Sequence, residues 1–155
     1  MSGLMNRNMG AKYIVGIDPG KTSGLAILAQ SGVLLYHTQG SPVMIWEVLE
    51  TYHPDYAVLE KATARPKQGV VSTCSFCKTF GFWEGVLTAL RIPYVLVSPT
   101  RWKRILDSGK RDKAHVVDWV NRMFGLKLKK SYHHEAEAVA MAWWGLGELK
   151  KTGAI

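Results

Sequence analysis

Short apolar runs rich in β-branched residues alternate with turn residues near the start of the chain, a pattern that predicts strands. The first run, Lys12 to Ile17, stops at Asp18-Pro19-Gly20, and a turn-like Gln30-Ser31-Gly32 separates the next two. The strands expected here are residues 12–17, 24–28 and 33–38. Because the connections between them are too short for crossovers, we expect these strands to pair antiparallel.

Helical periodicity and apolar runs alternate over the rest of the chain. Ser41 and Pro42 suit the start of an amphipathic helix that ends at His53-Pro54-Asp55. Two more strands are expected at residues 56–59 and 94–97, and further helices at residues 79–90, 99–106, 112–124 and 133–149. Residues 61–78 have no clean period and are expected to form a loop, and residues 127–130 a basic linker.

This order of elements predicts an α/β fold with a mixed five-stranded sheet, three antiparallel strands followed by two parallel ones, flanked by helices. The chain of 155 residues has the length of one domain. We expect a flexible N-terminus over residues 1–11 and a single domain over residues 12–150.

Charge narrows the choice of partner. Twenty Lys and Arg residues against twelve Asp and Glu give a formal charge of +8, which favours nucleic acid as a polyanionic partner. No apolar run approaches the roughly 18–20 residues needed to cross a bilayer, and residues 1–9 lack the apolar core of a signal peptide. With two cysteines, too few for a disulfide framework, we expect a cytoplasmic protein without a membrane partner.

Two carboxylates stand where predicted strands end, Asp18 after the first and Glu60 after the fourth. If these strands are neighbours, both side chains reach the crevice at which open α/β sheets bind ligands. Clustered carboxylates repel one another, so the pair indicates a shifted pKa or a divalent cation between them. The alternative is that each residue simply begins a turn.

A third acidic group opens the last predicted helix. Residues three or four apart share a helix face, so either His133 or His134 can lie beside Glu137, and the spacing leaves that choice open. Glu135 lies about 200° around the axis from Glu137 and cannot share its face. The alternative is an ordinary solvated helix N-terminus, where acidic residues are favoured by the helix dipole.

Two other motifs are weaker evidence for a functional site. Residues 16–22 have one residue too few between the first glycine and Gly20-Lys21-Thr22 to form a phosphate-binding P-loop. Cys74 and Cys77 have the spacing of half a zinc site or of a redox CxxC motif, but no second pair of ligands is nearby. Two small residues in a loop are the better interpretation.

Basic residues gather in two segments that suit contacts with phosphates. The first follows Glu60 and contains Lys61, Arg65, Lys67, Gln68, Ser72, Phe76 and Lys78. The second contains Arg101, Lys103, Arg104, Lys110, Arg111 and Lys113. An exposed Phe76 can also wedge into a base step. Either segment can instead be an ordinary solvated face, and the position of the first beside Glu60 favours a functional role.

Three motifs in register resemble the RuvC-type Holliday junction resolvases: Gly16–Gly20, Pro54–Glu60 and the His134-x-x-Glu137 helix start. The resemblance spans about residues 12–147. It is closest to the bacteriophage-encoded branch through Gln68-Gly69, through Phe80-Gly81-x-x-x-Gly85, and through Ser98-Pro99-x-x-Trp102-Lys103.

This resemblance implies an RNase H-like fold and a homodimer that cuts two opposed strands of a four-way DNA junction. It also implies two Mg²⁺ or Mn²⁺ ions per active site, held by Asp18, Glu60, His134 and Glu137. The resemblance, not helical geometry, selects His134 over His133. The family usually has Asp at the position of Glu137, so Glu135 is kept as a lesser candidate.

Two cations about 3.5–4 Å apart would activate the attacking water and stabilise the leaving 3′ oxygen. The resemblance implies that Asp18 bridges them and that Lys113 or Lys110 steadies the scissile phosphate. It also implies that the loop after Glu60 enters the junction centre with Phe76, and that residues 80–90 pair with the second subunit. For a phage-encoded protein the compartment is the cytoplasm of the bacterial host.

Two other functions fit the same residues. One is an RNase H-like nuclease that acts on other branched DNA or on RNA–DNA hybrids, since it needs the same basic groove and metals. The other is a catalytically silent module that binds branched DNA, and the full carboxylate set argues against it.

Overall fold

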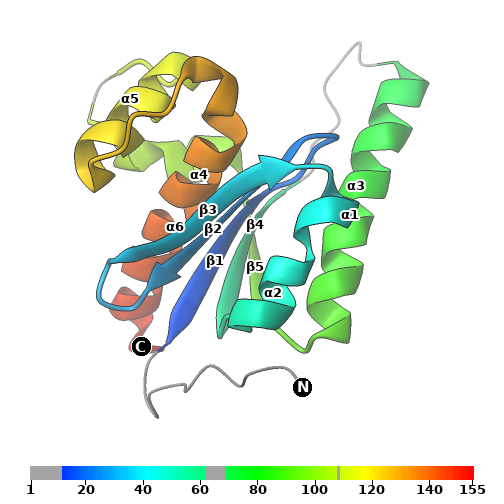
Figure 1. Ribbon diagram of the computed structural model, residues 1–155, viewed down its shortest axis with the longest axis horizontal. Helices are drawn as coiled ribbons and strands as arrows, with labels where there is room; N and C mark the ends of the chain where they lie inside the picture. Colours follow the sequence, from blue (N-terminus) through cyan, green and yellow to red (C-terminus); the bar gives the residue numbers. More distant parts are fainter. Residues whose placement is uncertain (1–11, 62–68, 108) are drawn as a thin grey trace.

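The computed structural model describes residues 12–61, 69–107 and 109–155, and shows one sheet with helices on both faces (Figure 1). The strands are β1 (Tyr13–Asp18), β2 (Ser23–Ala29), β3 (Leu34–Gly40), β4 (Tyr56–Glu60) and β5 (Tyr94–Val97). They lie in the order β3-β2-β1-β4-β5, with β1, β2 and β3 antiparallel and β4 and β5 parallel to β1. The predicted mixed five-stranded sheet is therefore confirmed.

The helices divide between the two faces of the sheet (Figure 1). One face is covered by α1 (Pro42–Ile45), α2 (Glu47–Tyr52) and α3 (Val70–Ala89). The other carries α4 (Pro99–Trp102), the 3-10 turn η1 (Lys103–Ile105), α5 (Lys113–Phe124), the 3-10 turn η2 (Lys130–Tyr132) and α6 (His133–Thr152). Side chains of β1 alternate between the faces, so Ile14 packs in the α5–α6 layer and Val15 in the α2–α3 layer. No helix in the described ranges has the length and apolarity to span a membrane.

The start of α3 differs from the sequence prediction. Residues 61–78 were expected to form a loop, but α3 begins at Val70, so the loop prediction was wrong for residues 70–78. The first turns of this helix carry no apolar face because they extend beyond the core, where Val70 and Val71 are 79% and 83% exposed. Hydrophobic periodicity reports burial against a core, and it is therefore missing from a helical segment that has none. The predicted helix after Pro42 is likewise divided into α1 and α2.

Glycines let α6 lie directly against the sheet. A Cβ atom at Gly24 of β2 would lie 1.9 Å from the carbonyl oxygen of His134, and one at Gly16 of β1 would lie 2.1 Å from that of Ala138. Real Cβ atoms never come so close, so only glycine fits at these two positions. The contact fixes the N-terminal end of α6 beside the end of β1.

A buried hydroxyl joins α3 to the turn that follows β1. Ser23 Oγ donates to the carbonyl of Gly20 at 2.8 Å and accepts from Trp83 Nε1 at 3.0 Å. The backbone N–H of Gly20 also donates to Ser23 Oγ, at 3.2 Å. Ser23 and Trp83 are fully buried, so one atom links the centre of α3 to the turn that begins at Asp18.

Candidate active site

A cleft of about 990 Å³ opens where β1 and β4 end. The two strands are parallel neighbours with Ile17 opposite Leu59, so the next residues, Asp18 and Glu60, stand side by side at the sheet edge. The start of α6 adds His133, His134 and Glu137 to the same cleft. Three chain segments that are distant in sequence thus meet at one point.

The carboxyl groups of this cleft disfavour their own ionisation. Asp18 is 6% exposed, and its burial, followed by the nearby negative charge of Glu60, raises its pKa well above the ordinary value. Burial, the charge of Asp18 and a hydrogen bond with Asp18 raise the pKa of Glu137 to about 8. At neutral pH these two neighbouring carboxyl groups therefore resist being ionised together, as expected of closely spaced carboxylates.

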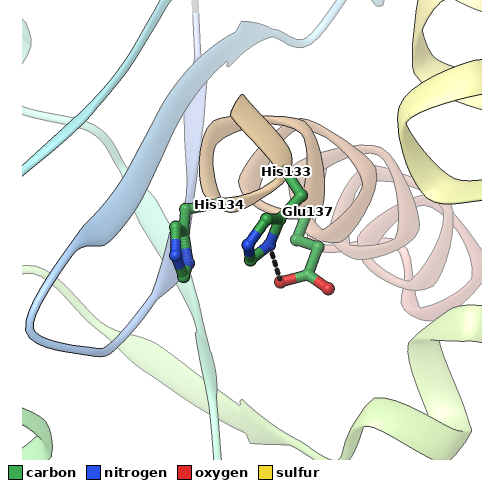
Figure 2. A group of neighbouring side chains, drawn as sticks. All are labelled: His133, His134 and Glu137. Atoms are coloured by element: carbon green, nitrogen blue, oxygen red, sulfur yellow. Dashed lines mark ion pairs between the residues drawn. The ribbon is translucent and has the colours of Figure 1, made fainter. Parts of the chain in front are cut away.

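His133 points toward the carboxyl group of Glu137 (Figure 2), and His134 lies beside Asp18. His134 Nδ1 lies 2.9 Å from Asp18 Oδ2, and His133 Nδ1 lies 3.9 Å from Glu137 Oε2. Burial lowers the pKa of His134, and burial with the neighbouring cations lowers that of His133 to about 4. Both imidazoles are thus neutral at pH 7, the form that binds metals.

These residues fit a divalent cation. One ligand atom each from His133, His134 and Glu137 lies within 4.8 Å of the other two. Among the described residues, His133 Nδ1 is the one buried side-chain nitrogen or oxygen that has no hydrogen-bond partner. A buried polar atom is normally satisfied, so an imidazole nitrogen without a hydrogen bond, 3.9 Å from Glu137 Oε2, suits a metal site.

Trp102 orients Glu60 from outside the cleft. Its indole Nε1 donates to Glu60 Oε2 at 2.7 Å, and the ring is fully buried. Lys103 Nζ lies 5.5 Å from the centre of the same ring. Composition and spacing do not reveal this role, because a tryptophan in a short helix is typical of a core residue.

Lysines surround the carboxyl groups. Lys61, Lys103 and Lys113 line the cleft as the sequence predicts, and Lys130 joins them from η2. The charges of Lys103 and Lys113 lower the pKa of Asp18, opposing the larger effect of burial. Sequence reasoning missed Lys130, which it assigned to a basic linker.

The other predicted DNA contacts are scattered. Ser72 and Phe76, on the exposed first turns of α3, line the cleft, whereas Lys78 and Lys110 are exposed outside its lining. Arg101 lines a different groove. Three of the predicted contacts lie outside the described residues, namely Arg65, Lys67 and Gln68.

Glu135 turns away from the cleft. Its Oε2 lies 2.6 Å from His37 Nδ1 of β3, and its side chain is absent from the cleft lining. This placement agrees with its position on the opposite side of α6 from Glu137. Cys74 and Cys77 are both exposed on α3.

The architecture of this chain matches solved structures of junction resolvases. Thermus thermophilus RuvC in complex with a Holliday junction substrate superimposes with a TM-score of 0.72, over 92% of this chain and 96% of that one. The chain has the RuvC fold. Sequence identity to that RuvC is 19%. The fowlpox virus Holliday junction resolvase matches with a TM-score of 0.54 and 20% identity, over 90% of this chain and 99% of that one. No protein-family model and no curated protein matches the sequence.

Proposed function

We propose that this protein is a Holliday junction resolvase of the RuvC type, an endonuclease that cuts two opposed strands of a four-way DNA junction. The observation that carries the proposal is the convergence of Asp18, Glu60 and Glu137 in one lysine-lined cleft at the ends of β1 and β4. The RuvC fold and the charge of +8 support it.

Asp18, Glu60, His134 and Glu137 are the ligands that we propose for two divalent cations, Mg²⁺ or Mn²⁺, with His133 beside them. Such cations supply an activated water and stabilise the leaving oxygen in phosphodiester hydrolysis.

The remaining cleft residues hold the substrate and the ligands in place. Lys113 and Lys103 lie close enough to influence Asp18, so they can neutralise a phosphate at the same point. Trp102 fixes one oxygen of Glu60 through its hydrogen bond. Phe76 and Ser72 stand at the cleft on α3, where an aromatic ring can contact an unstacked base of the junction.

We further propose a homodimer, because a substrate of near two-fold symmetry requires two equivalent sites. The surface of α3 suits the contact, since Gly81 and Gly85 have open space beside them and Val70 and Val71 are exposed. The segment from Phe80 to Gly85 also supports assignment to the bacteriophage-encoded branch, which would act in the cytoplasm of a bacterial host.

The deciding experiment is nicking of a labelled synthetic four-way junction and of a linear duplex with the same sequence, in Mg²⁺, Mn²⁺ or EDTA. Paired, symmetric, metal-dependent cuts near the branch point are expected. Equal cutting of both substrates would identify a broader nuclease, and tight binding without cuts would identify a silent binding module. The Asp18→Asn variant should bind the junction without cutting it. Near-native nicking by this variant would show that Asp18 is not part of the active site.

A further inference from the structure

A second groove, of about 450 Å³, lies between the α4–η1 segment and the C-terminal half of α6. Three cations line it, Arg101 and Arg104 from the short segment and Lys151 from α6. Glu148 is its one acidic residue, and Trp143 and Trp144 contribute aromatic surface. We call it the Arg101 groove.

Arg101 lines this groove and contacts two residues of α6. Its guanidinium carbon lies 5.2 Å from the centre of the Trp144 ring, and its Nη2 lies 3.8 Å from Glu148 Oε2. Glu148 also contacts Lys151 Nζ at 3.3 Å. The side chain of Arg101 is nevertheless 57% exposed, so its remaining donors face solvent.

The Arg101 groove and the active-site cleft are the two sides of one short element. Along residues 99–105, Pro99 and Lys103 line the cleft, whereas Arg101 and Arg104 line the groove. On α6, Glu137 faces the cleft and Glu148 the groove, and eleven residues at 1.5 Å each separate their backbone positions by about 16 Å along the helix axis. Cations therefore stand on both sides of this element, Lys103 at the cleft and Arg101 with Arg104 at the groove.

We propose that the Arg101 groove binds the phosphodiester backbone of a junction arm as the arm leaves the cleft, an inference that rests on the proposed resolvase function. Three cations against one carboxylate give the groove a net positive charge, which complements a polyanion. An arm that runs along α6 over this axial distance covers about five base pairs, at 3.4 Å per base pair. The contact reads no sequence, because it engages phosphates alone.

The salt dependence of junction binding tests this assignment. Arg101→Gln, Arg104→Gln and Lys151→Gln together remove three charges while keeping polar side chains of moderate length. Each phosphate contact contributes about 0.9 to the slope of log affinity against log salt, so the slope should fall by about 2.7. The ratio of wild-type to variant affinity should then shrink about 40-fold between 50 and 200 mM salt. Lys150→Gln is the matched control, since this exposed neighbour on α6 lines neither the groove nor the cleft.

A second variant changes binding in the opposite direction. Glu148→Gln removes the negative charge of the groove and should tighten junction binding about twofold to fivefold, which loss of packing would not do. Neutral methylphosphonate linkages about four to six nucleotides from the cut should lower the affinity of the wild type for the junction. The same linkages should leave the affinity of the triple variant unchanged.

A triple variant with the wild-type slope, or a Glu148→Gln variant that binds no tighter, would overturn the arm contact while leaving the resolvase function intact. If the wild type neither binds nor cuts the junction, the resolvase function and the arm contact fail together. A thermal melt of the triple variant that matches that of the wild type would show that the fold is retained.

Discussion

Replacement of Glu137 by Gln should stabilise the metal-free protein at neutral pH. Burial and Asp18 raise the pKa of this carboxyl from 4.5 to about 8. Below pH 4.5 the group is protonated in both the folded and the unfolded chain, so it contributes no pH dependence. Between pH 4.5 and 8 the unfolded chain releases a proton that the folded chain keeps, so stability falls as pH rises.

The size of the effect follows from this difference in pKa. One pKa unit corresponds to about 1.36 kcal/mol, so the carboxyl destabilises the fold by about 3 kcal/mol at pH 7 and by close to nothing at pH 4. Glu137→Gln removes the ionisation in both states and keeps a side chain that can donate to Asp18. The free energy of unfolding of the variant should therefore exceed that of the wild type by about 3 kcal/mol at pH 7 and equal it at pH 4.

Urea unfolding in EDTA at pH 4, 5.5 and 7 measures the difference directly. Glu50→Gln, at an exposed position of α2, is the control and should leave the pH profile unchanged. Added Mn²⁺ should stabilise the wild type, by about 2.7 kcal/mol at a concentration of 100 Kd, and leave Glu137→Gln unaffected. A variant that is less stable than the wild type at pH 7, or equally stabilised at pH 4 and 7, would refute the reasoning.

Two further variants examine how the site is supported. Trp102→Phe keeps the buried ring and loses the hydrogen bond to Glu60, so Mn²⁺ affinity measured by calorimetry should fall about 10- to 100-fold. Unchanged affinity would mean that the indole only packs. Gly24→Ala should destabilise the fold by about 1–3 kcal/mol or more, because the new methyl group meets the carbonyl of His134. Gly147→Ala, at an open position of α6, should be neutral or stabilising in the same thermal melt, and equal losses in both variants would contradict the close-contact argument.

The parts of this site that the sequence predicts are those governed by local pattern. The ends of the first and fourth strands follow from apolar runs, and with them the meeting of Asp18 and Glu60. Helical spacing could not choose between His133 and His134, because α6 directs its N-terminal end at the cleft and both rings reach it. Spacing along a helix predicts which residues share a face, but at the end of a helix residues on different faces can reach the same cleft.

Contacts between distant segments lie beyond such patterns. The bond from Trp102 to Glu60 and the position of Lys130 at the cleft depend on how α4 and η2 dock on α6, which no local period encodes. The same holds for Arg101, which the sequence groups with Lys103 although the two lie on opposite sides of one short element. A separation of two positions along the chain therefore places one cation at the cleft and the other at the Arg101 groove.

The contact of α6 with Gly16 and Gly24 matters for anyone who would re-engineer this protein. Because it joins main chain to main chain, the spacing between Asp18 and the start of α6 does not depend on which apolar side chains fill the layer beneath. Volume-conserving exchanges at buried positions such as Val139 and Met141 should then be tolerated while the cleft keeps its dimensions. The two glycines are the positions at which a sequence library should allow no variation.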